Sequence, residues 1–135
     1  AEAFKPDAIV MSGTLSDFDF YNPEHLKKAC EFIKSTKIPI LAICGAHQLV
    51  GVCFGHELRT LDNFDPSEKR SARVVEYQYR FVKILDKDDP IFEGIDNPTS
   101  GVWQDYTMQE DILKVWQNHG LQVEGVPDGF KLLAT

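Results

Sequence analysis

The feature that most constrains the fold is a short apolar run that ends at a cysteine and passes directly into a helical pattern. The run is Pro39–Ile43, Cys44 and Gly45 follow it, and apolar residues then recur at helical spacing to about Phe54. A continuous apolar run of this length is typical of a parallel strand covered on both faces. The segment therefore predicts a buried strand, a sharp turn at Cys44 and a helix.

The same order of elements occurs once before it. Asp7–Met11 is a short apolar run closed by Ser12-Gly13-Thr14, and a helix is predicted from Pro23 to about Ser35, with Asn22 as its N-cap. Strand, helix, strand and helix with short connections predict an α/β fold: a doubly wound, mostly parallel sheet with helices on both faces. The two strands should be parallel neighbours, with Cys44 at the carboxyl end of its strand.

The second half of the chain is predicted to be richer in strands. The polar stretch Asp62–Arg70 is predicted to be a surface loop, and the sequence from Ser71 to Leu85 is rich in β-formers. Further strands are predicted at Gly101–Thr107, Ile112–Gln117 and Phe130–Ala134. A length of 135 residues corresponds to a single domain.

Composition excludes several classes of function. The net charge is −7, with no clustered basic residues, which argues against direct nucleic-acid binding. The apolar runs are far shorter than the ~18 residues that a membrane-spanning helix needs. The three cysteines have no tight spacing, which argues against a disulfide framework and is typical of a cytoplasmic protein.

Cys44 is the candidate nucleophile. It lies between small residues where a buried strand meets a helix, which is the layout of a nucleophile elbow, and a helix N-terminus favours a thiolate. The alternative is a buried structural cysteine, which suits Cys30 and Cys53 better. If the elbow is present, iodoacetamide should alkylate Cys44 faster than the other two cysteines.

Several segments, taken in order, resemble the class I glutamine amidotransferase domain. The cysteine motif is Ala42-Ile43-Cys44-Gly45-Ala46-His47-Gln48, with Phe54-Gly55-His56 later. Pro6–Thr14 is similar to the family's oxyanion strand, and Asp88–Gly94 is similar to a common connecting piece. Val115–Gly120, followed by Val126–Phe130, resembles the segment that lines the glutamine pocket.

The resemblance implies a flavodoxin-like fold and a role for each matching residue. Cys44 would attack the side-chain amide of glutamine, and the backbone N–H groups of Thr14 and Gly45 would hold the oxyanion. The residues that would hold the amino-acid end of the substrate are Gln48, Asn118, Gly120 and Leu121. No cofactor and no metal are implied. The acidic loop Ser16–Tyr21, predicted to be solvated, would lie near the mouth of the active site.

The sequence departs from the family pattern at several points. Ala42 and Ala46 replace glycines at the elbow, and Thr14 replaces a glycine in the oxyanion strand. The family's N-terminal strands and its C-terminal His-x-Glu segment, which carries the general base, do not occur within residues 1–135. These residues are therefore expected to be one partial amidotransferase-like domain rather than the whole functional protein. His47 is predicted to pack on its helix, and His119 remains as an alternative partner for Cys44.

Three functions follow from the resemblance. The first is an enzyme that hydrolyses glutamine and delivers ammonia to a synthase domain or subunit. The second is a γ-glutamyl peptidase on the same scaffold, and the third is a non-catalytic binding module. A small-molecule substrate is expected for the first two, with no nucleic-acid or membrane partner.

Overall fold

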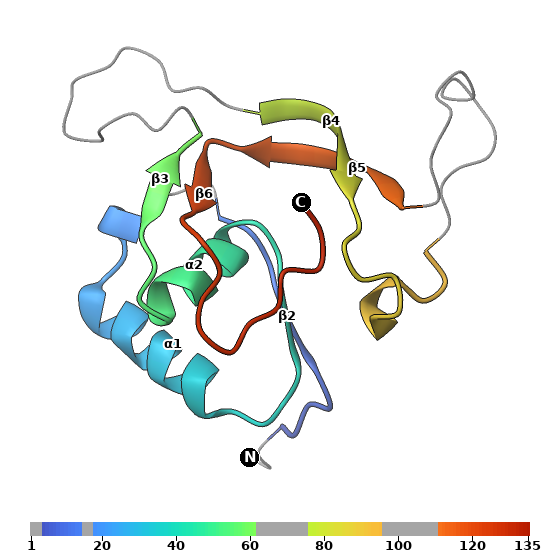
Figure 1. Cartoon of the computed structure of the whole chain (residues 1–135). Coiled ribbons are helices and arrows are strands. Elements are labelled where there is room, and N and C mark those ends of the chain that lie inside the picture. Colours follow the sequence, from blue (N-terminus) through green and yellow to red (C-terminus); the bar gives the residue numbers. More distant parts are fainter. Residues whose placement is uncertain (1–3, 15–17, 62–75, 96–110) are drawn as a thin grey trace. The chain divides into compact units, whose positions relative to one another are not determined.

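A computed structural model describes residues 4–14, 18–61, 76–95 and 111–135 of the chain (Figure 1). The chain forms two compact units. The first comprises Ala1–Val74 and Gly120–Asp128, and the second comprises Val75–His119 and Gly129–Thr135.

The first unit contains the predicted parallel pair of strands. β1 (Ile9–Met11) pairs with β2 (Ile40–Ala42), with Ile9 opposite Ile40 and Met11 opposite Ala42. The bond from the Ile43 amide to the Met11 carbonyl, at 3.0 Å, extends this pairing toward Cys44. The α/β class and the adjacency of these two strands are confirmed.

Both predicted helices are present in the first unit. α1 is Pro23–Ser35, and the Asn22 side chain accepts a hydrogen bond from the Glu24 amide at 2.8 Å. Pro23 occupies the first turn, where its missing N–H costs nothing. α2 is Gly45–Cys53 and begins directly after Cys44. The cap and proline signals therefore locate the start of α1, and the turn predicted at Cys44 locates the start of α2.

A disulfide joins the two helices and corrects the prediction made from cysteine spacing. Cys30 of α1 and Cys53, the last residue of α2, form a disulfide with an S–S distance of 2.02 Å. Cys53 is only 5% exposed, so the bond lies within the packed interface of the helices. The argument from cysteine usage for a reducing compartment therefore fails, because the pairing depends on helix packing and not on spacing in the sequence.

Reduction of this disulfide is expected to destabilise the protein. The bond closes a loop with a sequence separation of 23, and the chain-entropy model gives roughly 3 kcal/mol for a loop of this size. Urea denaturation with and without reductant, in a Cys44→Ala background, measures the difference. The Cys30→Ser/Cys53→Ser variant should have the stability of the reduced protein and no sensitivity to reductant. Equal stability in both conditions would contradict the prediction.

Two strands of three residues each complete the first unit. β3 (Leu58–Thr60) pairs antiparallel with β6 (Leu121–Val123), and this pair packs on α2. The approach is close, since a methyl group added to Gly51 would lie 2.6 Å from Val123 Cγ1. The buried side chains here include Ala46, Cys53 and Thr60. These strands were not predicted, because three residues are too few to show a periodic pattern.

One face of the parallel pair is open. Val10 and Leu41 are cross-strand neighbours, with exposed fractions of 68% and 49%. The opposite face carries Ile9, Met11, Ile40 and Ala42, which are half-buried. Both faces of the pair therefore carry apolar side chains, which is the residue pattern of a parallel sheet covered on both sides.

The second unit is a long antiparallel ribbon. β4 (Glu76–Lys83) pairs with β5 (Ile112–His119) along its whole length. One face carries an aromatic row, in which the Tyr77 and Tyr79 rings each lie 5.0 Å from the Trp116 ring. The predicted β-structure at Ile112–Gln117 is confirmed, as is the part of Ser71–Leu85 that lies within the described residues.

The predicted strand at Phe130–Ala134 is wrong. Instead of a continuous strand, Ala134 forms an isolated bridge with Ile84. The Thr135 and Lys83 backbones exchange two hydrogen bonds, and the Leu85 amide donates to the Leu133 carbonyl at 2.8 Å. Lys131 instead donates to the Asp86 carboxylate, which lowers the pKa of Asp86 and raises the pKa of Lys131. The predicted strand Gly101–Thr107 and loop Asp62–Arg70 lie outside the described residues.

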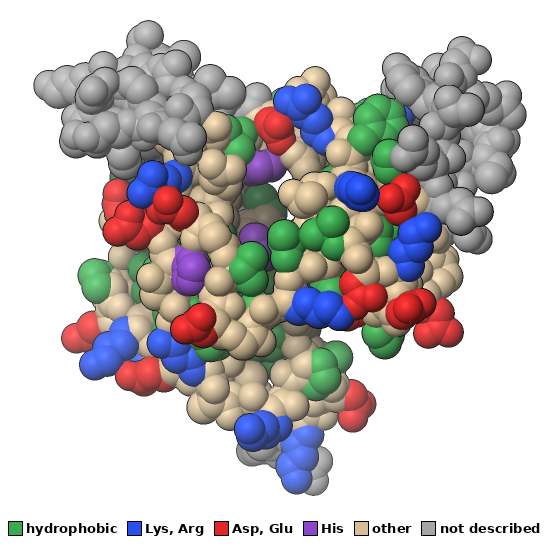
Figure 2. Space-filling view, in the orientation of Figure 1, with side chains coloured by type: hydrophobic (Ala, Val, Ile, Leu, Met, Phe, Trp, Pro, Cys, Tyr) green, Lys and Arg blue, Asp and Glu red, His purple; other side chains and the backbone are tan. Residues whose placement is uncertain are grey.

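The surface in Figure 2 shows lysine and arginine side chains interspersed with aspartate and glutamate side chains. Among the described helices, none is long and apolar enough to cross a membrane.

Candidate active site

Cys44 adopts the backbone conformation of a nucleophile elbow. Its φ is 54° and its ψ is −116°, and it is the one non-glycine residue with positive φ in the described part of the chain. Such a conformation costs of order 1–3 kcal/mol and persists only where the surroundings enforce it. The side chain is exposed, and because Cys30 and Cys53 are paired, Cys44 is the cysteine that keeps a thiol.

The turn is held by hydrogen bonds on both sides of Cys44. The Ala46 amide donates to the Ile43 carbonyl at 3.1 Å, and the Gln48 amide donates to the Cys44 carbonyl at 3.0 Å. Ala46 is 5% exposed and sits in the first turn of α2. Alanine at this position, where the family has glycine, is therefore accommodated by the elbow.

The segment that follows β1, Ser12–Thr14, packs directly against the elbow. A methyl group added to Gly13 would lie 3.0 Å from Cys44 Cβ and 3.3 Å from Cys44 Sγ. A methyl group added to Gly45 would lie 2.5 Å from Thr14 Cγ2 and 2.9 Å from the Thr14 amide nitrogen. A side chain at Gly45 would force a shift, and one at Gly13 would be tightly packed. These approaches place Thr14 and Gly45 in contact beside Cys44.

Thr14 also has a partner that the sequence did not indicate. Its hydroxyl lies 2.5 Å from the Tyr21 hydroxyl, in a hydrogen bond in which either group can be the donor. Tyr21 directly precedes Asn22, the N-cap of α1. The only signal for Tyr21 in the sequence is its position in the acidic loop, which was predicted to be solvated.

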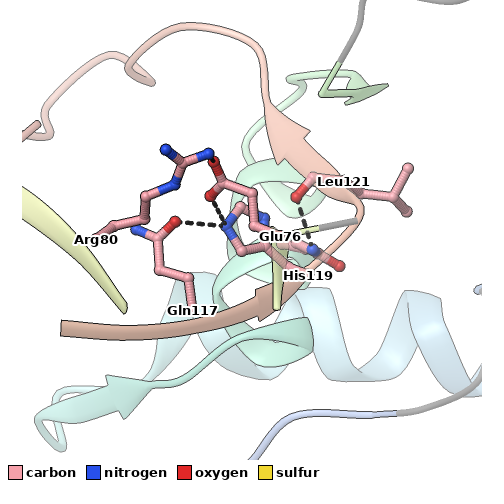
Figure 3. A network of polar contacts seen from close by, with 6 residues as sticks. Glu76, Arg80, Gln117, His119 and Leu121 are labelled. Carbon is pink, nitrogen blue, oxygen red and sulfur yellow. Dashed lines mark hydrogen bonds and ion pairs between the residues drawn. The ribbon is translucent and has the colours of Figure 1, made fainter. Parts of the chain in front are cut away.

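Two of the predicted substrate-binding residues are brought together in the first unit. Gln48 Nε2 donates to the Leu121 carbonyl at 3.1 Å, a contact between residues 73 positions apart (Figure 3). The Gly120 carbonyl accepts a bond from the Leu61 amide at 3.4 Å. Asn118 belongs to the second unit, on β5 opposite Tyr77.

The second unit contains a histidine paired with a carboxylate. His119 Nε2 lies 3.3 Å from Glu76 Oε2 and 3.1 Å from Gln117 Oε1 (Figure 3). Arg80 holds the other oxygen of Glu76 at 2.9 Å. His119 is therefore oriented by a carboxylate within its own ribbon, and its role as a partner of Cys44 stays a prediction.

The other histidines lie as follows. His25 and His47 are exposed on α1 and α2, so the predicted packing of His47 is wrong. His56 Nδ1 lies 2.5 Å from the Glu124 carbonyl, which links the end of α2 to the segment after β6. Within the described residues, no group of three or more histidine, cysteine or acidic side chains could hold a metal ion.

Comparison with known families decides how this geometry is classified. The model of the class-I glutamine amidotransferase family matches residues 1–135, the full span of the chain. This chain belongs to the class-I glutamine amidotransferases. The strained Cys44, the adjacent end of β1 and the close-packed glycines are thus features of a member of that family.

The relatives found by sequence are GMP synthases. The chain is 31% identical over 133 residues to a subunit of the glutamine-hydrolyzing GMP synthase of Pyrococcus furiosus, covering 98% of this chain and 55% of that protein. It is 30% identical over 132 residues to the glutamine-hydrolyzing GMP synthase of Candida glabrata, covering 98% of this chain and 20% of that protein. The chain thus spans about half of the separate subunits and a fifth of the longer synthases.

A solved structure supports the fold assignment. The crystal structure of a protein from Thermoplasma acidophilum, described as a subunit of GMP synthase, matches with a TM-score of 0.63 and 23% identity. The match covers 95% of this chain and 51% of that one. The arrangement of strands and helices is therefore that of the amidotransferase fold.

Proposed function

We propose that this chain carries the glutaminase chemistry of a glutamine amidotransferase, with Cys44 as the nucleophile. The observation that carries the proposal is the positive φ of Cys44 at the turn from β2 to α2. Strain at an exposed reactive side chain is typical of a functional site, and a structural cysteine has no need of it. Membership of the amidotransferase family supports glutamine hydrolysis as the class of reaction.

In the proposed reaction, the Cys44 thiolate forms a bond to the side-chain carbonyl carbon of glutamine. The carbonyl electrons move to oxygen, and the backbone N–H groups of Thr14 and Gly45 stabilise the resulting oxyanion. The carbon–nitrogen bond then breaks, and the nitrogen takes up a proton and leaves as ammonia. Water hydrolyses the thioester, which gives glutamate and restores Cys44. In the first unit, the residues proposed to hold the amino-acid end of glutamine are Gln48, Gly120 and Leu121.

The ammonia is proposed to pass to a synthase partner, as a separate subunit or a further domain. The relatives are named as glutamine-hydrolysing GMP synthases, both as subunits and as longer chains. A partner that transfers ammonia to a nucleotide to make GMP is the acceptor that this relationship supports.

Product analysis tests the proposal. Incubation of the full-length polypeptide with glutamine should release glutamate and ammonia in equal amounts. If an amino acid is released from γ-glutamyl dipeptides and no ammonia from glutamine, the protein is a γ-glutamyl peptidase. If neither substrate turns over in the presence of the synthase partner, the chain is a binding module and the proposal is wrong.

Gln48 gives a prediction about substrate binding. Its side chain is half-buried and fixed by the bond to Leu121, and hydrogen bonds of this kind contribute about 0.5–1.5 kcal/mol. We expect Gln48→Ala to raise KM for glutamine up to about tenfold with a smaller change in kcat, because the lost contact acts on substrate and transition state alike. The control is Gln122→Ala on the exposed side of β6. A loss confined to kcat would contradict the assignment.

A further inference from the structure

The oxyanion strand has a threonine where the family motif has glycine, and this threonine occupies a confined position. The Thr14 methyl group and amide nitrogen both face Gly45 so closely that Gly45 cannot carry a methyl group. The two backbone N–H groups proposed to bind the oxyanion therefore belong to residues in direct contact. A rotation of the Thr14 side chain would therefore change the packing between Thr14 and Gly45.

The Thr14 side chain is held by a hydroxyl contact across the loop. A threonine side chain can occupy more than one rotamer, and the hydrogen bond to the Tyr21 hydroxyl at 2.5 Å selects one of them. In this rotamer the Thr14 methyl group lies over Gly45. The contact joins residues seven positions apart.

Tyr21 is itself fixed to the helical part of the unit. Its amide donates to the Phe18 carbonyl at 3.0 Å, and its ring lies 6.2 Å from the Phe18 ring. It directly precedes the N-cap of α1, and α1 is covalently joined to α2 through Cys30 and Cys53. Tyr21 thus leads into α1, and α1 is joined to α2, the helix that begins after Cys44.

We propose that Tyr21 is a positioning residue, which holds Thr14 through the hydroxyl contact so that the Thr14 N–H is prearranged for the oxyanion formed at Cys44. The inference rests on the proposed role of Cys44 as an acyl-accepting nucleophile. Glycine at position 14 would have no side chain to hold, so the role proposed for Tyr21 arises from the threonine. The tyrosine compensates for the side chain that threonine introduces beside the elbow.

The test compares two reactions of the Cys44 thiol. With p-nitrophenyl acetate, the thiolate adds to the ester carbonyl, an oxyanion forms, and p-nitrophenolate leaves. With iodoacetamide, sulfur displaces iodide and no oxyanion forms. The ratio of the two rates reports oxyanion stabilisation separately from thiol reactivity. The full-length polypeptide is used without reductant, so that Cys30 and Cys53 stay paired.

The variants are Tyr21→Phe, which removes the hydroxyl, Thr14→Val, which replaces the hydroxyl with a methyl group of similar size, and the double variant. Loss of a whole oxyanion donor costs ~10²–10³-fold, so misplacing one donor is expected to lower the rate ratio about tenfold. The double variant should lose no more than either single variant, because the two hydroxyls act as one contact. Tyr79→Phe, which removes a hydroxyl in the second unit, should leave the ratio unchanged.

Each outcome decides the proposal. A tenfold loss of acylation with an unchanged alkylation rate in both single variants supports it. An unchanged ratio in Tyr21→Phe, additive losses in the double variant, or equal losses in both reactions overturn it. The ratio does not depend on glutamine. A protein that shows the expected ratios but releases no ammonia would refute the glutaminase proposal and leave the role of Tyr21 established.

Discussion

Replacement of Cys44 by alanine is expected to abolish glutamine hydrolysis, with a loss of about 10⁴-fold or more, as for other catalytic nucleophiles. The side chain is exposed, so its truncation leaves no cavity and should hardly change the stability of the fold. Ammonia release and urea denaturation measure the two effects. Hydrolysis that survives the substitution would show that another group is the nucleophile.

Cys44→Gly separates the strain at the elbow from the chemistry. This variant is expected to be equally inactive, since it also lacks the thiol. It should be about 1 kcal/mol more stable than Cys44→Ala, because glycine adopts a φ of 54° without the steric cost that any side chain incurs. If the alanine variant is the more stable of the two, the elbow stores no strain.

Gly45→Ala is expected to have the second largest effect. Its new methyl group would lie 2.5 Å from Thr14 Cγ2 and 2.9 Å from the Thr14 amide nitrogen, so one of the two segments must move. Because at least one of the two proposed oxyanion donors is displaced relative to the other, we expect a loss of ~10²–10³-fold in kcat for glutamine hydrolysis. Overpacking at this buried position should also cost about 1–3 kcal/mol of stability.

Gly51→Ala is the matched control on the same helix. Its methyl group would lie 2.6 Å from Val123 Cγ1, so this variant should also lose stability. The clash is with β6 and not with the oxyanion strand, so the acylation-to-alkylation ratio at Cys44 should stay that of the parent protein. Val123→Ala should restore stability to Gly51→Ala. Equal losses of this ratio in both glycine variants would show that any disturbance of α2 abolishes the site.

Features that depend on neighbouring residues could be predicted from the sequence. The apolar runs before Ser12 and Cys44 identified β1 and β2, since a buried parallel strand has few alternatives to such a run. Asn22 and Pro23 located the start of α1 because capping is a local interaction. The elbow was predictable because Cys44 stands between a strand pattern and a helix pattern.

Features that join distant parts of the chain were decided only by the tertiary structure. The strands β3 and β6 are too short to show a period. The apolar stretch Phe130–Ala134 gave no sign that it forms an isolated bridge at Ala134 in place of a full strand. In the candidate site, the sequence indicated Cys44 and its motif but not the contact between Gln48 and Leu121.

By itself, the sequence determined the order of β1, α1, β2 and α2 and the position of the candidate nucleophile, because strand, cap and turn preferences act over a few residues. The Cys30–Cys53 disulfide was decided by the packing of α1 against α2, and the Tyr21–Thr14 hydrogen bond by the approach of these two side chains in space. Such contacts depend on which side chains meet in the folded chain, and this cannot be predicted from composition or from spacing in the sequence.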